Sequence, residues 1–374
     1  MYCPKCGKEN PEGAGVCSGC GSPLPGASAP AEEPITKTSG LAIAAFVLGI
    51  LSPFTCAITA IPAIVLAIIS IVRIDRSGGR LTGANFAEIG IIPAVIAILM
   101  IGILIPALAK QREIAFRMTC GSNLSGIGKA MIIYSNDYQD QFPRAGGRNT
   151  VWGGAGSVVW NAPNRFKAYS LQADGTGGRA TISSCFYLLI KYAEVTPKSF
   201  VCKGDSGTSE FKLSEYSRGD LQLMDCWDFG PDPWKHCSYA YHIPFGLYAL
   251  TTSSEPGMAV AADRNPWIIS PAADVKNMAY FNPTGTVEQQ KYGNSISHQE
   301  DGQNVLFMDG HVYFEKRSYC AIKDDNIYTF WDGGDIRRGG WPIGAQPQDR
   351  RDSLLVHDPP GMPAEMRPPV RSRE

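Results

Sequence analysis

One uncharged run that continues into an amphipathic helix constrains this chain more than any other feature. Residues 89–109 are 21 residues without a charge, and a membrane-spanning helix needs about 20 apolar residues. From residue 110 to 134 the larger apolar residues recur at spacings near three and four, which predicts a helix with one apolar face that packs on a sheet. That face comprises Ile114, Met118, Leu124, Ile127, Met131 and Tyr134. The sequence thus predicts one helix over 84–136 that anchors a C-terminal domain in a membrane and also forms part of its core.

The overall charge argues against a nucleic-acid-binding protein. The 374 residues carry a net charge of -1, and only 18% of them are charged, so there is no excess of basic residues to bind phosphates. The apolar excess is concentrated in residues 41–109. We therefore expect membrane lipid, and not nucleic acid, as a partner.

Two closely spaced cysteine pairs predict a zinc site in residues 1–23. Cys3 and Cys6, and then Cys17 and Cys20, each form a Cys-x-x-Cys-Gly knuckle, which is the ligand pattern of a tetrahedral Zn²⁺ site. So short a unit cannot bury a sufficient core, and the metal must supply the folding energy. Four thiolates leave no open position, so the ion is expected to be structural. The alternative is a pair of disulfides or redox dithiols.

The next segments are predicted to be a flexible linker over 24–39, rich in Pro, Ala and Ser, and a membrane segment over 40–83. Residues 41–72 carry no charge and are interrupted at Ser52 and Pro53. They form either one long tilted span or a helical hairpin. Arginines follow at 73, 76 and 80, and basic loops stay cytoplasmic. These charges favour the hairpin. In that arrangement residues 1–23, which resemble a small bacterial zinc ribbon, lie in the cytoplasm. Residues 89–109 then lead outward, and the C-terminal domain is extracytoplasmic.

Residues 137–343 are predicted to be an α+β globular domain, and residues 344–374 a disordered tail rich in Pro and Arg. A short helix is expected over 182–194, strands over 238–241 and 258–261, and a hairpin over 304–314 that turns at an Asp-Gly pair. Six scattered cysteines suggest disulfides in an oxidising compartment, with 15 pairings open. They are Cys120, Cys185, Cys202, Cys226, Cys237 and Cys320.

Two stretches resemble a known family. Residues 97–143 resemble the N-terminal helix of the G-type pseudopilins of type II secretion, which are type IV pilin-like proteins, and most of all the expanded set of planctomycete-like bacteria. A second stretch resembles the family's late His…Asn-Val-Leu-Phe-x-Asp-Gly signature. The matching residues are Pro106–Leu108, Arg112, Arg117, Cys120, Asn123, Leu124, Ile127, Gly128, Ala130, Tyr134, Asp137, Phe142 and Pro143, and then His298, Gly302, Asn304, Phe307, Asp309 and Gly310.

This resemblance implies a long N-terminal helix packed on an antiparallel sheet, and secretion or pilus-like machinery as partners. A pilin leader ends in Gly with Glu at the fifth position after it, as Gly83 and Glu88 do here. However, some 80 residues with another membrane segment precede Gly83, so we expect no cleavage and interpret Glu88 as a residue at the membrane interface. Residues 39–101 also resemble a small bacterial membrane domain of unknown function that often follows zinc ribbons.

These features predict a non-enzymatic scaffolding or interaction protein of the bacterial inner membrane, linked to type II secretion or pilus-like systems. One alternative is a membrane sensor or regulator, with a cytoplasmic ribbon and a ligand-binding domain outside. The other is a metal-dependent hydrolase that uses His298, Asp309 and His311, with Glu300 and Asp301 nearby. Against the hydrolase, Asp309 and Gly310 are typical of a hairpin turn.

A calcium site is the last candidate. The loop over 324–335 offers carboxylate and amide oxygens, which suit a hard cation, and the G-type pseudopilins that this chain resembles use calcium near their C-terminal loop. The spacing of these residues is not diagnostic, and the alternative is a solvated loop. The candidate ligands are Asp324, Asp325, Asn326, Asp332 and Asp335.

Overall fold

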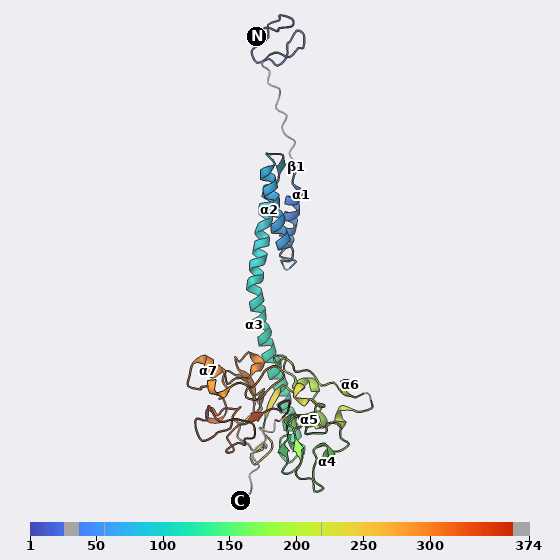
Figure 1. Cartoon of the computed structure of the whole chain (residues 1–374), viewed down its shortest axis with the longest axis vertical. Helices are drawn as coiled ribbons and strands as arrows, with labels where there is room; N and C mark the ends of the chain where they lie inside the picture. The colour runs from blue at the N-terminus through green and yellow to red at the C-terminus, as the bar shows by residue number, and fades with distance from the viewer. Residues whose placement is uncertain (26–36, 56, 218, 362–374) are drawn as a thin grey trace. The chain divides into compact units, whose positions relative to one another are not determined.

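The computed structural model describes residues 1–25, 37–55, 57–217 and 219–361. The chain divides into two compact units, residues 1–109 and 110–374. Helix α3 (Ala84–Asp137) is one continuous helix that begins in the first unit and ends in the second (Figure 1). Most of the expected linker lies outside the described residues.

Two helices and a short parallel ladder precede α3. They are α1 (Gly40–Leu51), α2 (Ala60–Arg76), β1 (Lys37–Thr38) and β2 (Leu81–Thr82). The chain turns back between α1 and α2, which pack against each other, so the structure has the hairpin and not the single long span. An α-helix rises 1.5 Å per residue, so helices of 12 and 17 residues are shorter than the ~30 Å hydrocarbon core of a bilayer.

Small residues line the contacts among α1, α2 and the start of α3. A side-chain Cβ on Gly49 would meet the carbonyl oxygen of Gly90 at 2.1 Å, so only glycine allows these two backbones to approach so closely. The Ser52 hydroxyl donates to the carbonyl of Gly49 at 2.7 Å and to that of Pro93 at 3.2 Å. The buried residues of these helices, with the C-cap Ser52 of α1, are all small: Ala42, Ala45, Gly49, Ser52, Ala60, Ala63, Ala67, Ser70, Ala87, Gly90, Ala94 and Ala97.

Many large apolar residues of these helices point outward. Ile61, Ile92 and Leu99 are each at least 60% exposed. A water-soluble bundle would bury such residues and expose polar ones, whereas small residues inside and large aliphatic residues outside are typical of helices packed in lipid. Of the described helices, α3 alone is long and apolar enough to cross a membrane, and only 11% of its most apolar window is buried.

The second unit is built on a five-stranded antiparallel sheet, which agrees with the predicted α+β class. The strand order is β8-β7-β6-β5-β9. The strands are β5 (Tyr239–His242), β6 (Ala259–Asp263), β7 (Gln303–Phe307), β8 (Val312–Glu315) and β9 (Leu355–Val356). Besides short 3₁₀ helices, the other elements described in this unit are β3 (Val151–Trp152), β4 (Arg179–Ala180), α4 (Arg165–Ala168), α5 (Ile182–Ala193), α6 (Leu213–Tyr216) and α7 (Val287–Lys291).

The predicted hairpin over 304–314 is confirmed. Strands β7 and β8 pair with Val305 opposite Tyr313, and the Gly310 N–H donates to the carbonyl of Phe307 at 2.9 Å. Gly310 has a φ of 86°, which a residue with a side chain rarely adopts. The predicted helix over 182–194 and the two predicted strands also match α5, β5 and β6.

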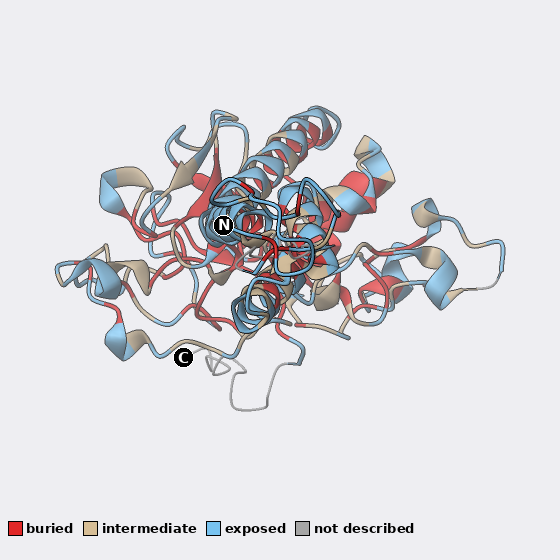
Figure 2. Ribbon diagram, turned by 90° about the horizontal axis from the view of Figure 1, so that it is seen from above, coloured by how far each residue is buried: buried red, intermediate tan, exposed pale blue. Residues whose placement is uncertain are grey.

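The C-terminal half of α3 packs on this sheet through the predicted apolar face. Leu124, Ile127 and Met131 are fully buried, and a Cβ on Gly128 would meet the side chain of Leu306 in β7 at 2.7 Å. Buried residues, which are red in Figure 2, concentrate inside the second unit, while its outer loops are largely exposed.

Two residues of the predicted face do not belong to it. Ile114 is 39% exposed and Met118 is 72% exposed, and both line a hollow of about 560 Å³ beside β8. At this end of the helix the charged side chains of Glu113 and Arg117 turn toward the sheet domain instead. Glu113 contacts the buried His298, and Arg117 forms an ion pair with Asp301.

The prediction of a disordered tail from residue 344 is wrong up to residue 361. Strand β9 closes one edge of the sheet by pairing with β5, and Asp358 accepts hydrogen bonds from the backbone N–H groups of Ile182 and Ser183 at 3.0 and 2.7 Å. A carboxylate at a helix N-terminus satisfies unpaired N–H groups and meets the positive end of the helix dipole. Residues 362–374 lie outside the described part of the chain.

Truncation of the buried face of α3 should destabilise the second unit. We expect Leu124→Ala to lower the free energy of unfolding by about 2–5 kcal/mol, because it leaves a cavity at a fully buried position. All seven tryptophans lie between residues 152 and 341, so tryptophan fluorescence of the full chain in detergent reports on this unit alone. The control Met118→Ala should change the value by less than about 0.5 kcal/mol. Equal effects of both changes would contradict this packing.

Candidate functional site

The four N-terminal cysteines converge as a metal site requires. Their ligand sulfurs lie within 4.8 Å of one another, with 3.7 Å between the Cys3 and Cys20 sulfurs and 3.5 Å between those of Cys6 and Cys17. Each knuckle closes with the N–H of the following glycine, Gly7 or Gly21, donating to the carbonyl of its first cysteine at 2.9 Å. Both glycines have a φ of 70°, which explains why glycine follows each pair.

Hydrogen bonds to sulfur prepare the second knuckle for a cation. The Gly19 N–H and the Asn10 amide each donate to the Cys17 sulfur at 3.4 Å, and these donors lower the pKa of Cys17 to about 6. The Ser22 hydroxyl and backbone lower the pKa of Cys20. Because the thiolate is the metal-binding form, these contacts favour a bound cation. The donor set fits structural Zn²⁺.

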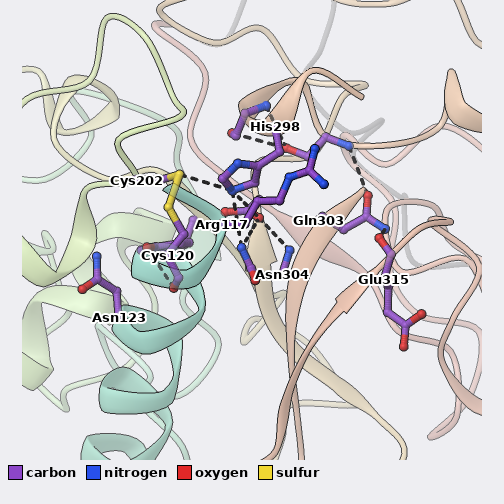
Figure 3. Close-up of polar contacts among 12 residues, drawn as sticks. Arg117, Cys120, Asn123, Cys202, His298, Gln303, Asn304 and Glu315 are labelled. Atoms are coloured by element: carbon purple, nitrogen blue, oxygen red, sulfur yellow. Dashed lines mark hydrogen bonds and ion pairs between the residues drawn. A yellow bond between two sulfur atoms is a disulfide. The ribbon is translucent and has the colours of Figure 1, made fainter. Parts of the chain in front are cut away.

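The second cluster surrounds the buried His298, in the short 3₁₀ helix Ile296–His298 of the second unit. Its Nδ1 lies 3.0 Å from Glu113 Oε1 on α3, and its Nε2 lies 3.3 Å from Asp263 Oδ2 on β6. The same Nε2 lies 3.5 Å from the Cys202 sulfur and 3.4 Å from the Asn304 amide nitrogen. Figure 3 shows His298 between the disulfide and the strand that carries Asn304.

The carboxylates set the electrostatics of this cluster. Burial alone lowers the pKa of His298, but Asp263 and Glu113 outweigh it and raise that pKa above its ordinary value. Asp263 Oδ2 is held by the Asn304 backbone N–H at 2.7 Å and its amide at 3.2 Å. The other oxygen, Oδ1, is buried and has no hydrogen-bond partner in the described part of the chain.

An ion-pair chain extends this cluster to the surface. Arg117 lies 3.6 Å from Glu113 and 2.8 Å from Asp301, and Asp301 lies 2.8 Å from Lys291. The Arg117 guanidinium also sits over the Phe314 ring, 4.5 Å from its centre. The α3 residues Glu113, Arg117 and Cys120 therefore tie the helix to three separate segments of the second unit.

Of the six scattered cysteines, Cys120 and Cys202 form a disulfide with Cα atoms 5.3 Å apart. The other four form no disulfide within the described ranges: Cys185, Cys226, Cys237 and Cys320. The bond joins α3 to the segment before Gly204 and lies against His298 (Figure 3). Among the described residues there is thus one disulfide where the six scattered cysteines suggested several.

The three residues of the hydrolase alternative are not gathered into one site. Asp309 and His311 contact each other through Oδ1 and Nδ1 in the exposed β7–β8 turn, and the His311 ring stacks on Phe307. His298 instead contacts Glu113 and Asp263. In the described ranges, the candidate metal-ligand groups include neither Asp309 nor His311.

The calcium candidates are engaged with their own chain. Asp325 is buried and accepts from the Ser353 N–H at 2.7 Å, and Asp335 pairs with Arg337 at 2.9 Å. Asp332 accepts from the Gly334 N–H at 2.9 Å. No three carboxylates of this loop converge within the part of the chain that the structure describes, so nothing here supports calcium.

Sequence reasoning missed Glu113 and Asp263 as partners of His298. Glu113 had a usable signal, because Glu113, Arg117 and Cys120 extend the buried face of α3 at spacings of four and three. No local pattern pointed to Asp263, since it ends a strand and lies far from His298 in the sequence.

Comparison with known proteins identifies one part of the chain. Residues 2–24 match the zinc-ribbon domain family, which extends the predicted ribbon by one residue to Leu24, a residue buried with Cys3 and Cys17. No curated protein matches the chain. No solved structure matches it either.

Loss of one ribbon cysteine should remove the metal. We expect Cys17→Ser to reduce bound zinc by one ion per chain, measured by elemental analysis of purified protein, because three thiolates hold Zn²⁺ weakly and the ribbon folds around its ion. Lys5→Ala, an exposed change within the first knuckle, should keep the ion. Unchanged zinc in the Cys17 variant would refute the assignment.

The buried carboxyl of Asp325 should give the stability a pH dependence. Burial raises its pKa from 3.8 to about 8, so between these values the native state holds a proton that the unfolded state has released. Stability should therefore fall as the pH rises through this window. Asp325→Asn should make that decline shallower in denaturation curves followed by tryptophan fluorescence. The exposed Asp324→Asn should leave the slope unchanged, and an equal slope in both variants would exclude Asp325 as the source.

Proposed function

We propose that this protein is a non-enzymatic, membrane-anchored envelope protein, related to the pseudopilins, that couples a cytoplasmic zinc ribbon to an extracytoplasmic pilin-like domain. The proposal rests on a change along α3 in which apolar residues are exposed and which are buried. Its first half exposes large aliphatic residues such as Leu99, while its second half buries Leu124 and Met131 against a sheet. A helix that anchors a domain in lipid and supplies its core is the pilin-like plan that the sequence resembles.

The small-residue contacts of the first unit support the membrane assignment. Where α1, α2 and the start of α3 pack through Ala, Gly and Ser, many of the residues that face outward are large and apolar. Such a surface is stable in lipid and would associate or aggregate in water. The membrane lipid is therefore the first partner of this protein.

Charge and redox chemistry support the proposed orientation. Arg73, Arg76 and Arg80 follow the hairpin, as in a cytoplasmic loop. The Cys120–Cys202 disulfide suits an oxidising compartment, while the ribbon thiols suit a reducing one. In this arrangement the ribbon binds a partner inside the cell and the second unit works outside, in scaffolding or interaction within secretion or pilus-like machinery.

The orientation can be tested with one introduced cysteine on each side. Ser253→Cys and Arg80→Cys are both at exposed positions, and the native thiols are mostly buried or gathered in the ribbon. An impermeant maleimide should label Cys at 253 in intact cells and Cys at 80 only after lysis, with both variants in the membrane fraction. Labelling of both positions only after lysis would contradict the proposal.

The mature N-terminus distinguishes an anchored protein from a processed pilin subunit. We expect no cleavage after Gly83, so that N-terminal sequencing of the membrane-bound chain finds the ribbon and the hairpin still attached. A chain that begins at Ala84 would have lost the ribbon and the hairpin and would be a processed pilin.

A cavity favours the sensor as a second candidate function. It has a volume of about 390 Å³ and is lined by aromatic rings and two arginines, among them Tyr138, Tyr192, Arg144 and Arg165. Tyr134 and Tyr138 stack with ring centres 4.0 Å apart. Cavities of this size and lining bind small molecules. A thermal shift of the wild type with a ligand, lost in Tyr138→Ala, would favour the sensor.

A further inference from the structure

The geometry points to a second metal site in the protein: when the Cys120–Cys202 disulfide is reduced, we propose that the two thiolates, His298 Nε2 and Asp263 bind Zn²⁺ or a similar divalent cation. The four residues come from α3, the segment before Gly204, the 3₁₀ helix Ile296–His298 and β6. One ligand atom from each lies within 4.8 Å of the others, and all four residues are buried.

The spacing of the non-sulfur ligands suits a tetrahedral ion. Ligands that stand about 2.0–2.3 Å from a zinc ion at tetrahedral angles lie roughly 3.3–3.7 Å from one another. His298 Nε2 is 3.3 Å from Asp263 Oδ2 and 3.5 Å from the Cys202 sulfur. In the ribbon, two pairs of thiol sulfurs stand 3.5 and 3.7 Å apart, which lies within this range for two sulfur ligands of one ion.

The surroundings of His298 are those of a metal-bound imidazole. Metal-ligating histidines almost always donate their other ring N–H to a carboxylate or carbonyl. Here Nδ1 faces Glu113 Oε1 at 3.0 Å, so Nε2 is the nitrogen left to face the two sulfurs and Asp263. The carboxylate of Glu113 thereby acts as a positioning residue for the histidine.

Asp263 provides a second observation that favours a cation site. Its Oδ1 is fully buried and has no hydrogen-bond partner among the residues that the structure describes, while Asn304 holds Oδ2 from its backbone and its side chain. A buried carboxylate oxygen without a partner is costly. A cation between His298 and the two sulfurs would compensate the charge of this carboxylate.

The chemistry balances with a dithiol reductant. The dithiol is oxidised to its own disulfide, and its two electrons and two protons convert the Cys120–Cys202 bond into two thiols. Each thiol then releases its proton as its thiolate binds the cation. The disulfide form suits an oxidising compartment and the metal-bound form a reducing one. In both forms Cys120 and Cys202 link α3 to the rest of the second unit, through a covalent bond in the first and through the cation in the second.

Cobalt binding to the full chain in detergent tests the site. The four ribbon cysteines are first replaced by serine (Cys3→Ser, Cys6→Ser, Cys17→Ser and Cys20→Ser) so that only the second site remains. After reduction by dithiothreitol and its removal without oxygen, we expect one Co²⁺ per chain, with thiolate-to-cobalt absorption and tetrahedral visible bands. The oxidised protein should bind none, and zinc should displace the cobalt.

Single substitutions in this parent distinguish the proposed metal ligands from residues that do not bind the metal. Cys202→Ser and His298→Ala should abolish the thiolate-to-cobalt spectrum, and Glu113→Gln should weaken binding about 10- to 100-fold. Cys237→Ser, which removes another buried thiol, should bind Co²⁺ as tightly as the parent protein, the chain with the four ribbon serines. Tryptophan fluorescence reports whether each protein is folded. The reduced and oxidised forms of the four-serine parent can be compared without any substitution in the cluster.

Three results would overturn the proposal. The first is a reduced parent that binds no cobalt, whether it stays folded or unfolds. The second is equal binding by the oxidised and reduced forms. The third is a folded His298→Ala variant with the spectrum of the parent.

Discussion

The contact between one face of α3 and the five-stranded sheet is the interaction on which the second unit depends. Leu124, Ile127 and Met131 are fully buried, and glycine at position 128 brings the helix close to Leu306 of β7. Without the helix, one face of the sheet would be left uncovered in water, and a single sheet with one exposed apolar face is not stable. The helix is thus a structural member of the domain and not a tether.

The polar end of the same face adds a different kind of interaction. At Glu113, Arg117 and Cys120, contacts with His298 and Asp301 and a covalent bond to Cys202 replace aliphatic packing. A buried ion cluster adds little net stability over apolar residues, yet removal of one member leaves an uncompensated charge. Such a cluster specifies the register of the helix on the sheet more than it strengthens the fold, and it lies immediately after the apolar run ends.

Much of this organisation could be predicted from the sequence because it follows from local patterns. The charge-free run, the two Cys-x-x-Cys-Gly knuckles and the Asp-Gly turn at Asp309 each specify their structure within a few residues. The interruption at Ser52 and Pro53 likewise indicated the turn between α1 and α2.

The parts that were missed depend on partners far apart in the chain. Asp358 looked like part of a solvated tail because its neighbours are Pro and Arg, and only the fold brings it to the start of α5. The pairing of Cys120 with Cys202 was one of many combinations until the sheet positioned both. Similarly, the apolar spacing of Ile114 and Met118 outweighed the one local signal, the spacing of Glu113 and Cys120, that the helix turns its charged side toward the domain at that level. Local periodicity specifies that a face exists, whereas the tertiary partners decide which residues it includes.

Amide hydrogen exchange along α3 in the full chain tests the central claim most directly. If the helix is part of the folded domain, amides over residues 120–134 should exchange as slowly as those of β6 and β7, since they open only when the whole unit unfolds. Fast exchange over 120–134, while β6 and β7 stay protected, would mean that the domain folds without the helix, and the account would be wrong.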